Sequence, residues 1–131
     1  MIIKEIHIDG FGIFNNFSMT RLKGGINIIL GNNEAGKSTL LKFLRFTLFG
    51  YPKSVDQRMA PLNGGEHKGR IMALLSDNKK ITFERIAGSS GGSINLVYDE
   101  KSSEDKAFWN QLLGNATKEI FESVYAFSLD E

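Results

Sequence analysis

The sequence contains no cysteine, and this absence excludes several kinds of chemistry. Disulfide frameworks, thiolate metal sites, iron–sulfur clusters and cysteine nucleophiles all need that side chain. Proline is also scarce, with 2 residues against 14 glycines, so glycine is expected to mark most turns. No run approaches the roughly 18 apolar residues of a membrane span, and the first residues lack the features of a signal peptide. We therefore expect a cytoplasmic protein with no membrane partner.

Charge of one sign is not in excess either. Lys and Arg number 16 against 15 for Asp and Glu, which gives a net charge of +1. The blanket positive charge of a protein that coats DNA is therefore absent, although local contact with nucleic acid stays open. The chain has 131 residues, of which 41% are hydrophobic. This is the size and composition of one globular domain with its own core.

Hydrophobic spacing and glycine positions predict both strands and helices. The predicted strands span Met1–Asp9, Phe14–Leu22, Ile26–Leu30, Arg70–Leu75, Ile81–Ile86 and Ile94–Tyr98. A helix is predicted over Lys37–Phe49, because Leu40, Leu44 and Leu48 recur at four-residue spacing. Gly50 is expected to end it.

Four segments add detail to this prediction. The β-branched run Ile26–Leu30 is typical of a buried strand, and Tyr51–Gly69 is turn-rich and is expected to be a mobile loop. The last two strands should form an antiparallel hairpin. Residues 103–105 can cap a short helix that ends at Gly114, and another helix is expected near Thr117.

The strongest motif is G-x-x-x-x-G-K-[ST], the Walker A phosphate loop, between the predicted strand 26–30 and the predicted helix 37–49. The candidate nucleotide-binding residues are Gly31, Asn32, Asn33, Glu34, Ala35, Gly36, Lys37, Ser38 and Thr39. The glycines permit close backbone approach, and the amides of the loop and of the helix N-terminus converge on phosphate oxygens. Lys37 can reach the β- and γ-phosphates, and Ser38 can ligate Mg²⁺.

Several segments, including this loop, resemble the N-terminal segment of SMC-like ABC ATPases, most closely the YhaN-like branch. They are Ile6–Phe14, Gly25–Ile29, Gly31–Leu41, Leu48–Pro52 and Ile120–Glu131. The resemblance implies an α/β fold, namely the N-terminal lobe of an ABC-type P-loop NTPase head. A mixed sheet, the phosphate-loop helix on one face and an antiparallel subdomain from about Arg70 to Asp99 are then expected.

The resemblance also implies partners. Residues 1–131 would be one lobe of an ATP-binding head, a fragment of a longer chain, completed by the C-terminal half of the same head. Two heads would then close around ATP and Mg²⁺ as a homodimer, in DNA repair or DNA processing, with DNA and a nuclease as further partners. Hydrolysis would need the C-terminal half and the second head, so no catalytic residue is assigned within this chain.

Other motif matches are weaker. Leu96–Glu100 formally matches a Walker B strand with Asp99 and Glu100 as its acids, but Asn95 interrupts the apolar run and a hairpin is favoured. Gly88–Gly92 fits G-x-S-x-G, although the expected flanks are two strands rather than a strand and a helix. The family's Q-loop should fall at 126–131, where no glutamine stands. Ser128, Asp130 or a shifted alignment remain open.

Single residues add little. His7 and His67 lack metal-ligand spacing. Phe11 and Gly12 fall where related heads approach the nucleotide. Four basic residues of the predicted loop and its end could touch nucleotide or DNA, or could simply be solvated. They are Lys53, Arg58, Lys68 and Arg70.

Two other functions remain as alternatives. The first is a self-contained P-loop enzyme of the kinase or GTPase type, in which Asp99 and Glu100 would be the Walker B acids. Residues 78–81 lack the aspartate of the GTPase base-reading motif, and the five arginines do not cluster as a kinase lid requires. The second is a non-enzymatic module for assembly or DNA binding.

Overall fold

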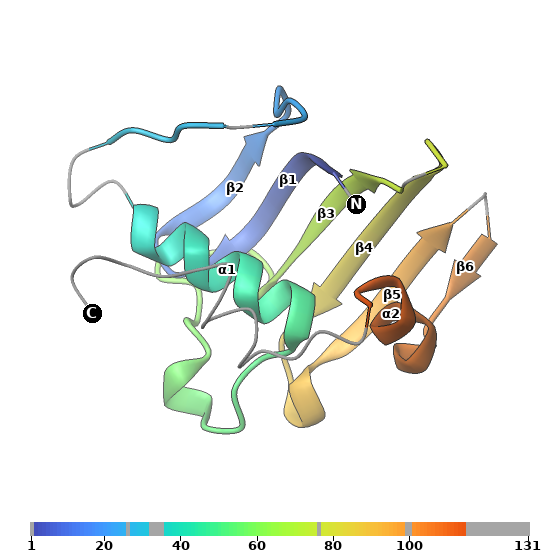
Figure 1. The fold of residues 1–131 in the computed structure, drawn as a ribbon. Helices are drawn as coiled ribbons and strands as arrows, with labels where there is room; N and C mark the ends of the chain where they lie inside the picture. Colours follow the sequence, from blue (N-terminus) through green and yellow to red (C-terminus); the bar gives the residue numbers. More distant parts are fainter. Residues whose placement is uncertain (1, 26, 32–35, 76, 99–100, 115–131) are drawn as a thin grey trace.

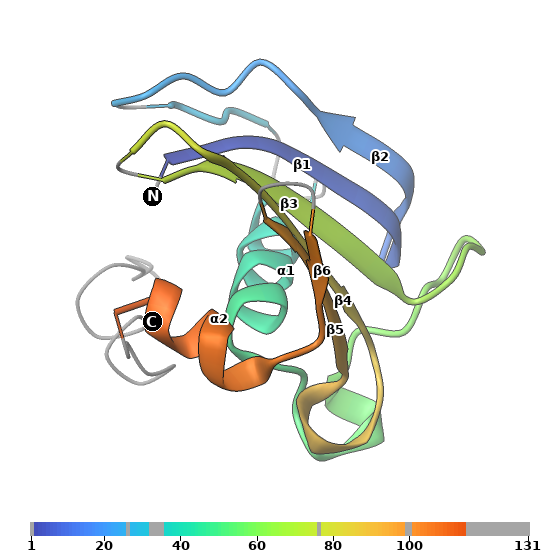
Figure 2. The same cartoon turned by 90° about the vertical axis from the view of Figure 1, so that its right-hand side faces the viewer.

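The computed structural model describes residues 2–25, 27–31, 36–75, 77–98 and 101–114. They form a six-stranded sheet in the order β2-β1-β3-β4-β5-β6, with every pair antiparallel, and two helices on one face (Figures 1 and 2). The strands are β1 Ile2–Phe11, β2 Phe14–Met19, β3 Lys68–Leu74, β4 Lys80–Ile86, β5 Ser93–Tyr98 and β6 Lys101–Ser103. The helices are α1 Lys37–Phe49 and α2 Lys106–Leu112, and short 3-10 turns lie at Val55–Gln57 and Ser89–Gly91.

The register of the sheet builds the core. Ile6, Ile71, Phe83 and Leu96 pair in sequence across β1, β3, β4 and β5, and all four are buried. Residues one position along each strand lie on the other face, because side chains alternate in a strand. Neither of the two described α-helices lies on that second face (Figure 2), and its side chains are mostly polar or charged. The sheet is therefore amphipathic, with its apolar face toward the helices.

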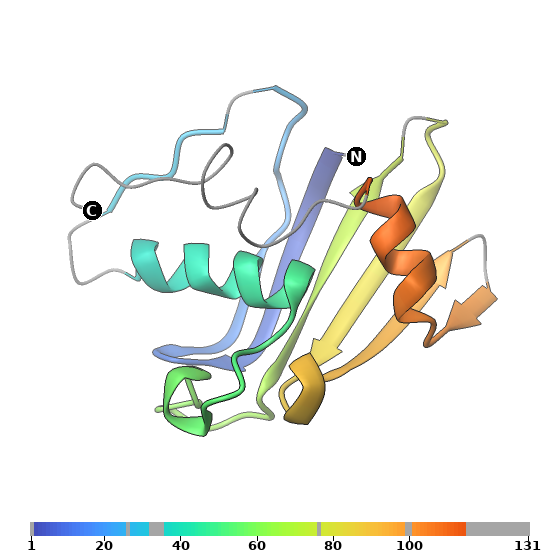
Figure 3. The ribbon, with the colours of Figure 1, turned by 60° about the horizontal axis from the view of Figure 1, so that its bottom comes forward.

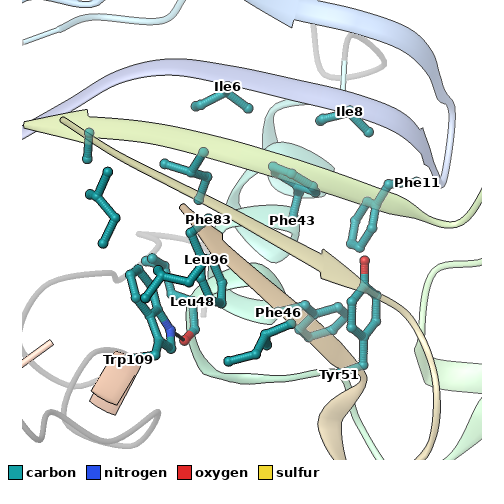
Figure 4. Close-up of a cluster of buried hydrophobic side chains, with 14 of the residues drawn as sticks. Ile6, Ile8, Phe11, Phe43, Phe46, Leu48, Tyr51, Phe83, Leu96 and Trp109 are labelled. Carbon is teal, nitrogen blue, oxygen red and sulfur yellow. Dashed lines mark hydrogen bonds between the residues drawn. The ribbon is translucent and has the colours of Figure 1, made fainter. Parts of the chain in front are cut away.

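Helix α1 has the predicted bounds, and its apolar side meets that face (Figure 4). Phe43 is fully buried and meets Phe11 edge-on, with 5.4 Å between ring centroids. Gly50 ends the helix at φ 115°, which suits glycine, and its amide donates to the Phe46 carbonyl.

The expected buried strand over 26–30 is not found. Asn27–Leu30 joins no sheet, and Ile28 and Leu30 are 78% and 87% exposed. Figure 1 shows this segment passing from the end of β2 toward the start of α1 outside the sheet. An apolar run becomes a buried strand only if neighbouring strands cover it, and none of the described strands pairs with it. The expected mixed sheet is also wrong for the described residues, because every strand pair among them is antiparallel.

The segment between α1 and β3 is more ordered than the mobile loop that its composition suggested. Gly12 donates to the Met59 carbonyl, and the Leu62 amide donates to the Gly12 carbonyl, so the segment is tied to the turn between β1 and β2. Asn63 bonds from its side chain to the Ile13 carbonyl. Hydrogen bonds to the distant turn between β1 and β2 thus hold a segment that has few apolar side chains of its own.

The remaining elements largely follow the prediction. β4 and β5 form the expected hairpin. The Asp105 side chain caps α2 by accepting from the Ala107 amide, and Gly114 follows the helix at φ 70°. Strand β6 was not predicted, because three residues carry no readable alternation. The helix expected near Thr117 lies outside the described residues.

A half-buried titratable group, His67, lies next to the core. The ring of His67 lies 5.1 Å from that of Tyr51 and 6.0 Å from that of Phe11. Its Nε2 atom is buried and has no hydrogen-bond partner among the described residues. Burial lowers the pKa of His67, and the nearby Arg58 adds opposing smaller effects through its backbone and its charge.

We predict that replacing Gly69 with alanine destabilises the fold. A Cβ at this position would collide with the Phe43 ring and crowd the His7 carbonyl. Overpacking of this kind costs about 1–3 kcal/mol. Gly24→Ala is the matched control, because the nearest atom to its Cβ would be 3.7 Å away. Urea unfolding should show a lower midpoint for Gly69→Ala only, and equal midpoints would contradict this packing.

We also predict that His67 makes stability depend on pH. Its folded pKa is below the unfolded value of about 6.5, so the unfolded chain binds more protons and stability falls as pH falls through that range. Between pH 7.5 and 5.5 (about one unit either side of that value), His67→Asn should lose less unfolding free energy than the wild type. An unchanged pH slope in the variant would argue against a buried neutral imidazole.

Candidate functional site

The N-terminal end of α1 is the part of the motif that the structure describes best. Gly36 precedes the helix at φ 89° in the left-handed region, and no side chain caps it among the described residues. The first turn also lacks an acidic residue. Lys37 and Ser38 are exposed there, whereas Gly36 is buried. Helix-terminal amides, a cation and a hydroxyl thus meet at one exposed point, an arrangement that suits a phosphate with its metal ion.

The turn between β1 and β2 supports this end of the helix. A Cβ on Gly36 would lie 2.8 Å from Ile13 Cδ1 and 2.9 Å from Phe14 Cζ. A Cβ on Gly12 would lie 2.9 Å from Thr39 Cγ2. Both glycines are therefore required by close packing as well as by positive φ. The first turn of α1 is held against the sheet rather than left free.

The other predicted binding residues are only partly placed. Gly31 is exposed, and Thr39 is half-buried with its methyl group toward Gly12. Residues 32–35 (Asn32, Asn33, Glu34 and Ala35) lie outside the described residues. The structure thus places Gly36, Lys37, Ser38 and Thr39 at the start of α1. The assignment of residues 32–35 rests on the sequence motif alone.

Two apolar cavities flank the segment that leads into the loop. One, of about 430 Å³, lies between Leu22, Ile29, Leu44 and the start of β1. The other, of about 220 Å³, extends from Phe14 and Phe17 to Ile29, Leu30 and the first residues of α1. Ile29 lines both. The exposed apolar run therefore borders incompletely filled apolar space.

Phe11 was expected near the nucleotide, and this is wrong. Its side chain is fully buried, and its ring is surrounded by those of Phe43, Phe46, Tyr51 and His67. Burying an aromatic ring in the core stabilises the fold more than leaving it at the surface. Only its neighbour Gly12 touches the first helical turn.

The four basic candidates separate into two kinds. Arg58 donates to the carbonyls of Pro52 and Lys53, so its charge holds the loop. Lys68 lies 3.5 Å from Asp9, 3.3 Å from Glu66 and 4.0 Å from Glu84, and the bond to Glu66 is the largest cause of its raised pKa. Both are structural. Lys53 and Arg70 are exposed and could meet a ligand.

The glycine–serine segment 88–92 is a structural turn. It connects β4 to β5 with no helix after it, so the hydrolase elbow is excluded. The Gly91 carbonyl accepts from the Tyr51 amide and from Arg85, which places the turn at the C-terminal end of α1.

The Walker B alternative is not favoured by the sheet order. Asp99 and Glu100 lie outside the described residues, but β5, which precedes them, is three strands away from β1. At about 4.8 Å per strand, that separation is roughly 14 Å from the strand whose end supports α1. No group of His, Cys, Asp and Glu among the described residues could hold a metal ion, and no described helix could span a membrane.

Sequence reasoning missed two residues at the far end of α1. Arg85 is 5% exposed and donates from Nε to the Thr47 carbonyl at 2.8 Å. Trp109 is 2% exposed and donates from Nε1 to the Leu48 carbonyl at 2.8 Å. One signal was available: Arg85 alternates in phase with Ile81 and Phe83, so it had to lie on the buried face.

Comparison with known proteins bears on the whole chain. The family model described as AAA domain matches residues 1–131. The uncharacterized protein YhaN of Bacillus subtilis is 28% identical over 128 residues, which cover 97% of this chain and 13% of that protein.

Two archaeal relatives carry a functional name. The DNA double-strand break repair Rad50 ATPase of Sulfolobus acidocaldarius is 41% identical over 104 residues, 77% of this chain and 12% of that protein. The protein of the same name from Sulfurisphaera tokodaii is 41% identical over 49 residues, 37% of this chain and 6% of that protein. This chain thus spans a small part of each relative's length.

These matches confirm the resemblance to the N-terminal segment of SMC-like ATPases that the motifs indicated. They agree with the α/β architecture, with α1 packed on an antiparallel sheet and Lys37 at its exposed end. The match over every residue decides the family: this chain belongs to the AAA domain family.

Proposed function

We propose that this chain binds ATP and Mg²⁺ through the Walker A loop and the first turn of α1. The observation that carries the proposal is the exposed, uncapped N-terminus of α1, where Lys37 and Ser38 follow a buried left-handed Gly36. An anionic ligand would there replace the missing cap and meet the positive end of the helix dipole. Lys37 would pair with the β- and γ-phosphates, and Ser38 would ligate Mg²⁺.

The rest of the predicted loop would complete the cradle. Gly31, Asn32, Asn33, Glu34 and Ala35 would supply backbone amides around the phosphates. The Thr39 hydroxyl would donate to the α-phosphate. The turn between β1 and β2 supports this assignment, because it fixes Gly36 and Thr39 from the side of the sheet.

We propose further that residues 1–131 are the N-terminal lobe of an ABC-type head. The exposed run Ile28–Leu30 supports this, since burying each such side chain stabilises by roughly 1.5–3 kcal/mol. Strands from the C-terminal half of the same head would cover the run and fill the cavities on either side of Ile29. The missing Walker B acid and the group that positions water would come from that half and from a second head.

The biological setting follows from the relatives. Two of them are named as ATPases of DNA double-strand break repair. We propose that the complete protein hydrolyses ATP as a homodimer in DNA repair or processing, in contact with DNA and beside a nuclease. The open face of the sheet bears charges of both signs, so DNA contact is assigned to local groups such as Lys53 and Arg70.

Replacing Lys37 with alanine should weaken ATP binding without unfolding the chain. Loss of one charge-assisted contact costs about 2–3 kcal/mol, or roughly 30- to 150-fold in affinity. Lys42→Ala is the matched control, because Lys42 is an exposed lysine on the same helix. Calorimetric titration with ATP and Mg²⁺ measures both. Equal affinities in the two variants would remove the role given to Lys37.

Replacing Leu30 with aspartate should leave the isolated chain stable but prevent assembly of the completed head. Leu30 is 87% exposed, so the urea midpoint of this chain alone should hardly change. Co-purification with the C-terminal half should be lost, because a charge would be buried without a partner. Retained co-purification would show that this run is not the contact.

Hydrolysis provides the test of the self-contained alternative. This chain alone should bind ATP yet turn it over far more slowly than the product of the full reading frame, since the water-positioning group is supplied elsewhere. Turnover by this chain at the rate of a complete ATPase, abolished by Asp99→Asn, would instead establish a self-contained P-loop enzyme.

A further inference from the structure

The C-terminal end of α1 is held by groups from distant parts of the chain. Carbonyls in the last turn of a helix have no partner within the helix. Here the Phe46 carbonyl accepts from the Gly50 amide, the Thr47 carbonyl from Arg85 and the Leu48 carbonyl from Trp109. The side-chain donors are 38 and 61 residues away in sequence. Three successive carbonyls are thus occupied, two of them by tertiary contacts.

Arg85 supplies the charge at this end. The last turn of α1 contains no basic residue, and a cation there interacts favourably with the negative end of the helix dipole. The Arg85 guanidinium also donates to the Gly91 carbonyl at 3.1 Å and lies 5.4 Å from the Phe83 ring centroid. It forms no salt bridge with a carboxylate in the part of the chain that the structure describes. A buried cation held by carbonyls alone is costly for stability, which points to a role in placement.

Trp109 connects the same end to α2. Its ring stacks on Phe83 with 3.7 Å between centroids and 7° between planes. Phe83 and Arg85 lie on one face of β4, so with Trp109 they form one unit around the end of α1. Figure 4 shows two of these side chains, Phe83 and Trp109, near Leu48. Figure 3 shows α2 beside the C-terminal end of α1, on the side away from the phosphate loop.

We propose that Arg85 and Trp109 are positioning residues that set the axial position of α1 and thereby couple the phosphate loop to α2. The proposal rests on the ATP binding proposed above. A helix of 13 residues is a rod about 20 Å long, so fixing one end fixes the amides and Lys37 at the other. The convergence of these groups on a phosphate depends on where the helix lies, so this restraint matters for phosphate binding. By reciprocity, bound nucleotide must strengthen the contacts at the far end.

The wild-type chain offers a direct test, because it contains a single tryptophan. The indole N–H of Trp109 gives one resonance in a ¹H–¹⁵N spectrum, and a non-hydrolysable ATP analogue with Mg²⁺ is the probe. As the analogue is added, the indole resonance should shift and the hydrogen exchange of the indole N–H should slow. The analogue concentration at half of this change should agree with the affinity measured by calorimetry. Lys37→Ala should move both responses to a correspondingly higher analogue concentration. Calorimetric binding with an unmoved indole resonance overturns the coupling and leaves the proposed function intact, whereas absence of calorimetric binding overturns both.

A pair of variants separates positioning from plain stability. Trp109→Phe keeps a ring on Phe83 and removes the donor to Leu48, and Ile94→Val removes a methylene from the buried face of β5. Both should lower the urea midpoint. Only Trp109→Phe should weaken binding of the analogue, by about 3- to 10-fold as expected for allosteric coupling. Arg85→Lys, which keeps the charge, should bind more tightly than Arg85→Met. Equal affinity in Trp109→Phe and Ile94→Val overturns the assignment.

Discussion

The packing of α1 on the apolar face of the antiparallel sheet is the constraint on which the rest of the structure depends. Phe43 sits over the glycine of β3 and against Phe11, so the helix approaches the sheet closely at its middle. The two ends of the helix then meet different parts of the chain. Its N-terminal turn meets the turn between β1 and β2, and its C-terminal turn meets β4 and α2.

The backbone groups at the two ends of α1 are satisfied to different degrees. The C-terminal carbonyls are occupied by Gly50, Arg85 and Trp109. The N-terminal amides have no side-chain cap among the described residues. A helix with one end satisfied by the protein and the other left exposed is suited to an external anion at the exposed end. In the proposed function, that anion is the triphosphate of ATP.

The exposed run Ile28–Leu30 gives the molecule a second incomplete region. Apolar side chains exposed beside apolar cavities indicate a surface that another segment covers. The run leads directly into the phosphate loop, so the segment that covers it would also shape the nucleotide site. In the proposed function, phosphate binding by this chain and completion of the head would therefore be physically linked.

The sequence alone determined the local features. The spacing of leucines gave the bounds of α1, the glycines marked its end and the hairpin turns, and the Walker A pattern located Lys37 and Ser38. Tertiary structure alone decided what depends on contacts between distant residues. Ile26–Leu30 has the composition of a buried strand, yet burial needs neighbouring strands that the described residues do not provide. Phe11 entered the core, and Arg85 and Trp109 reached the end of α1, because partners 38 and 61 residues away in sequence leave no local pattern to read.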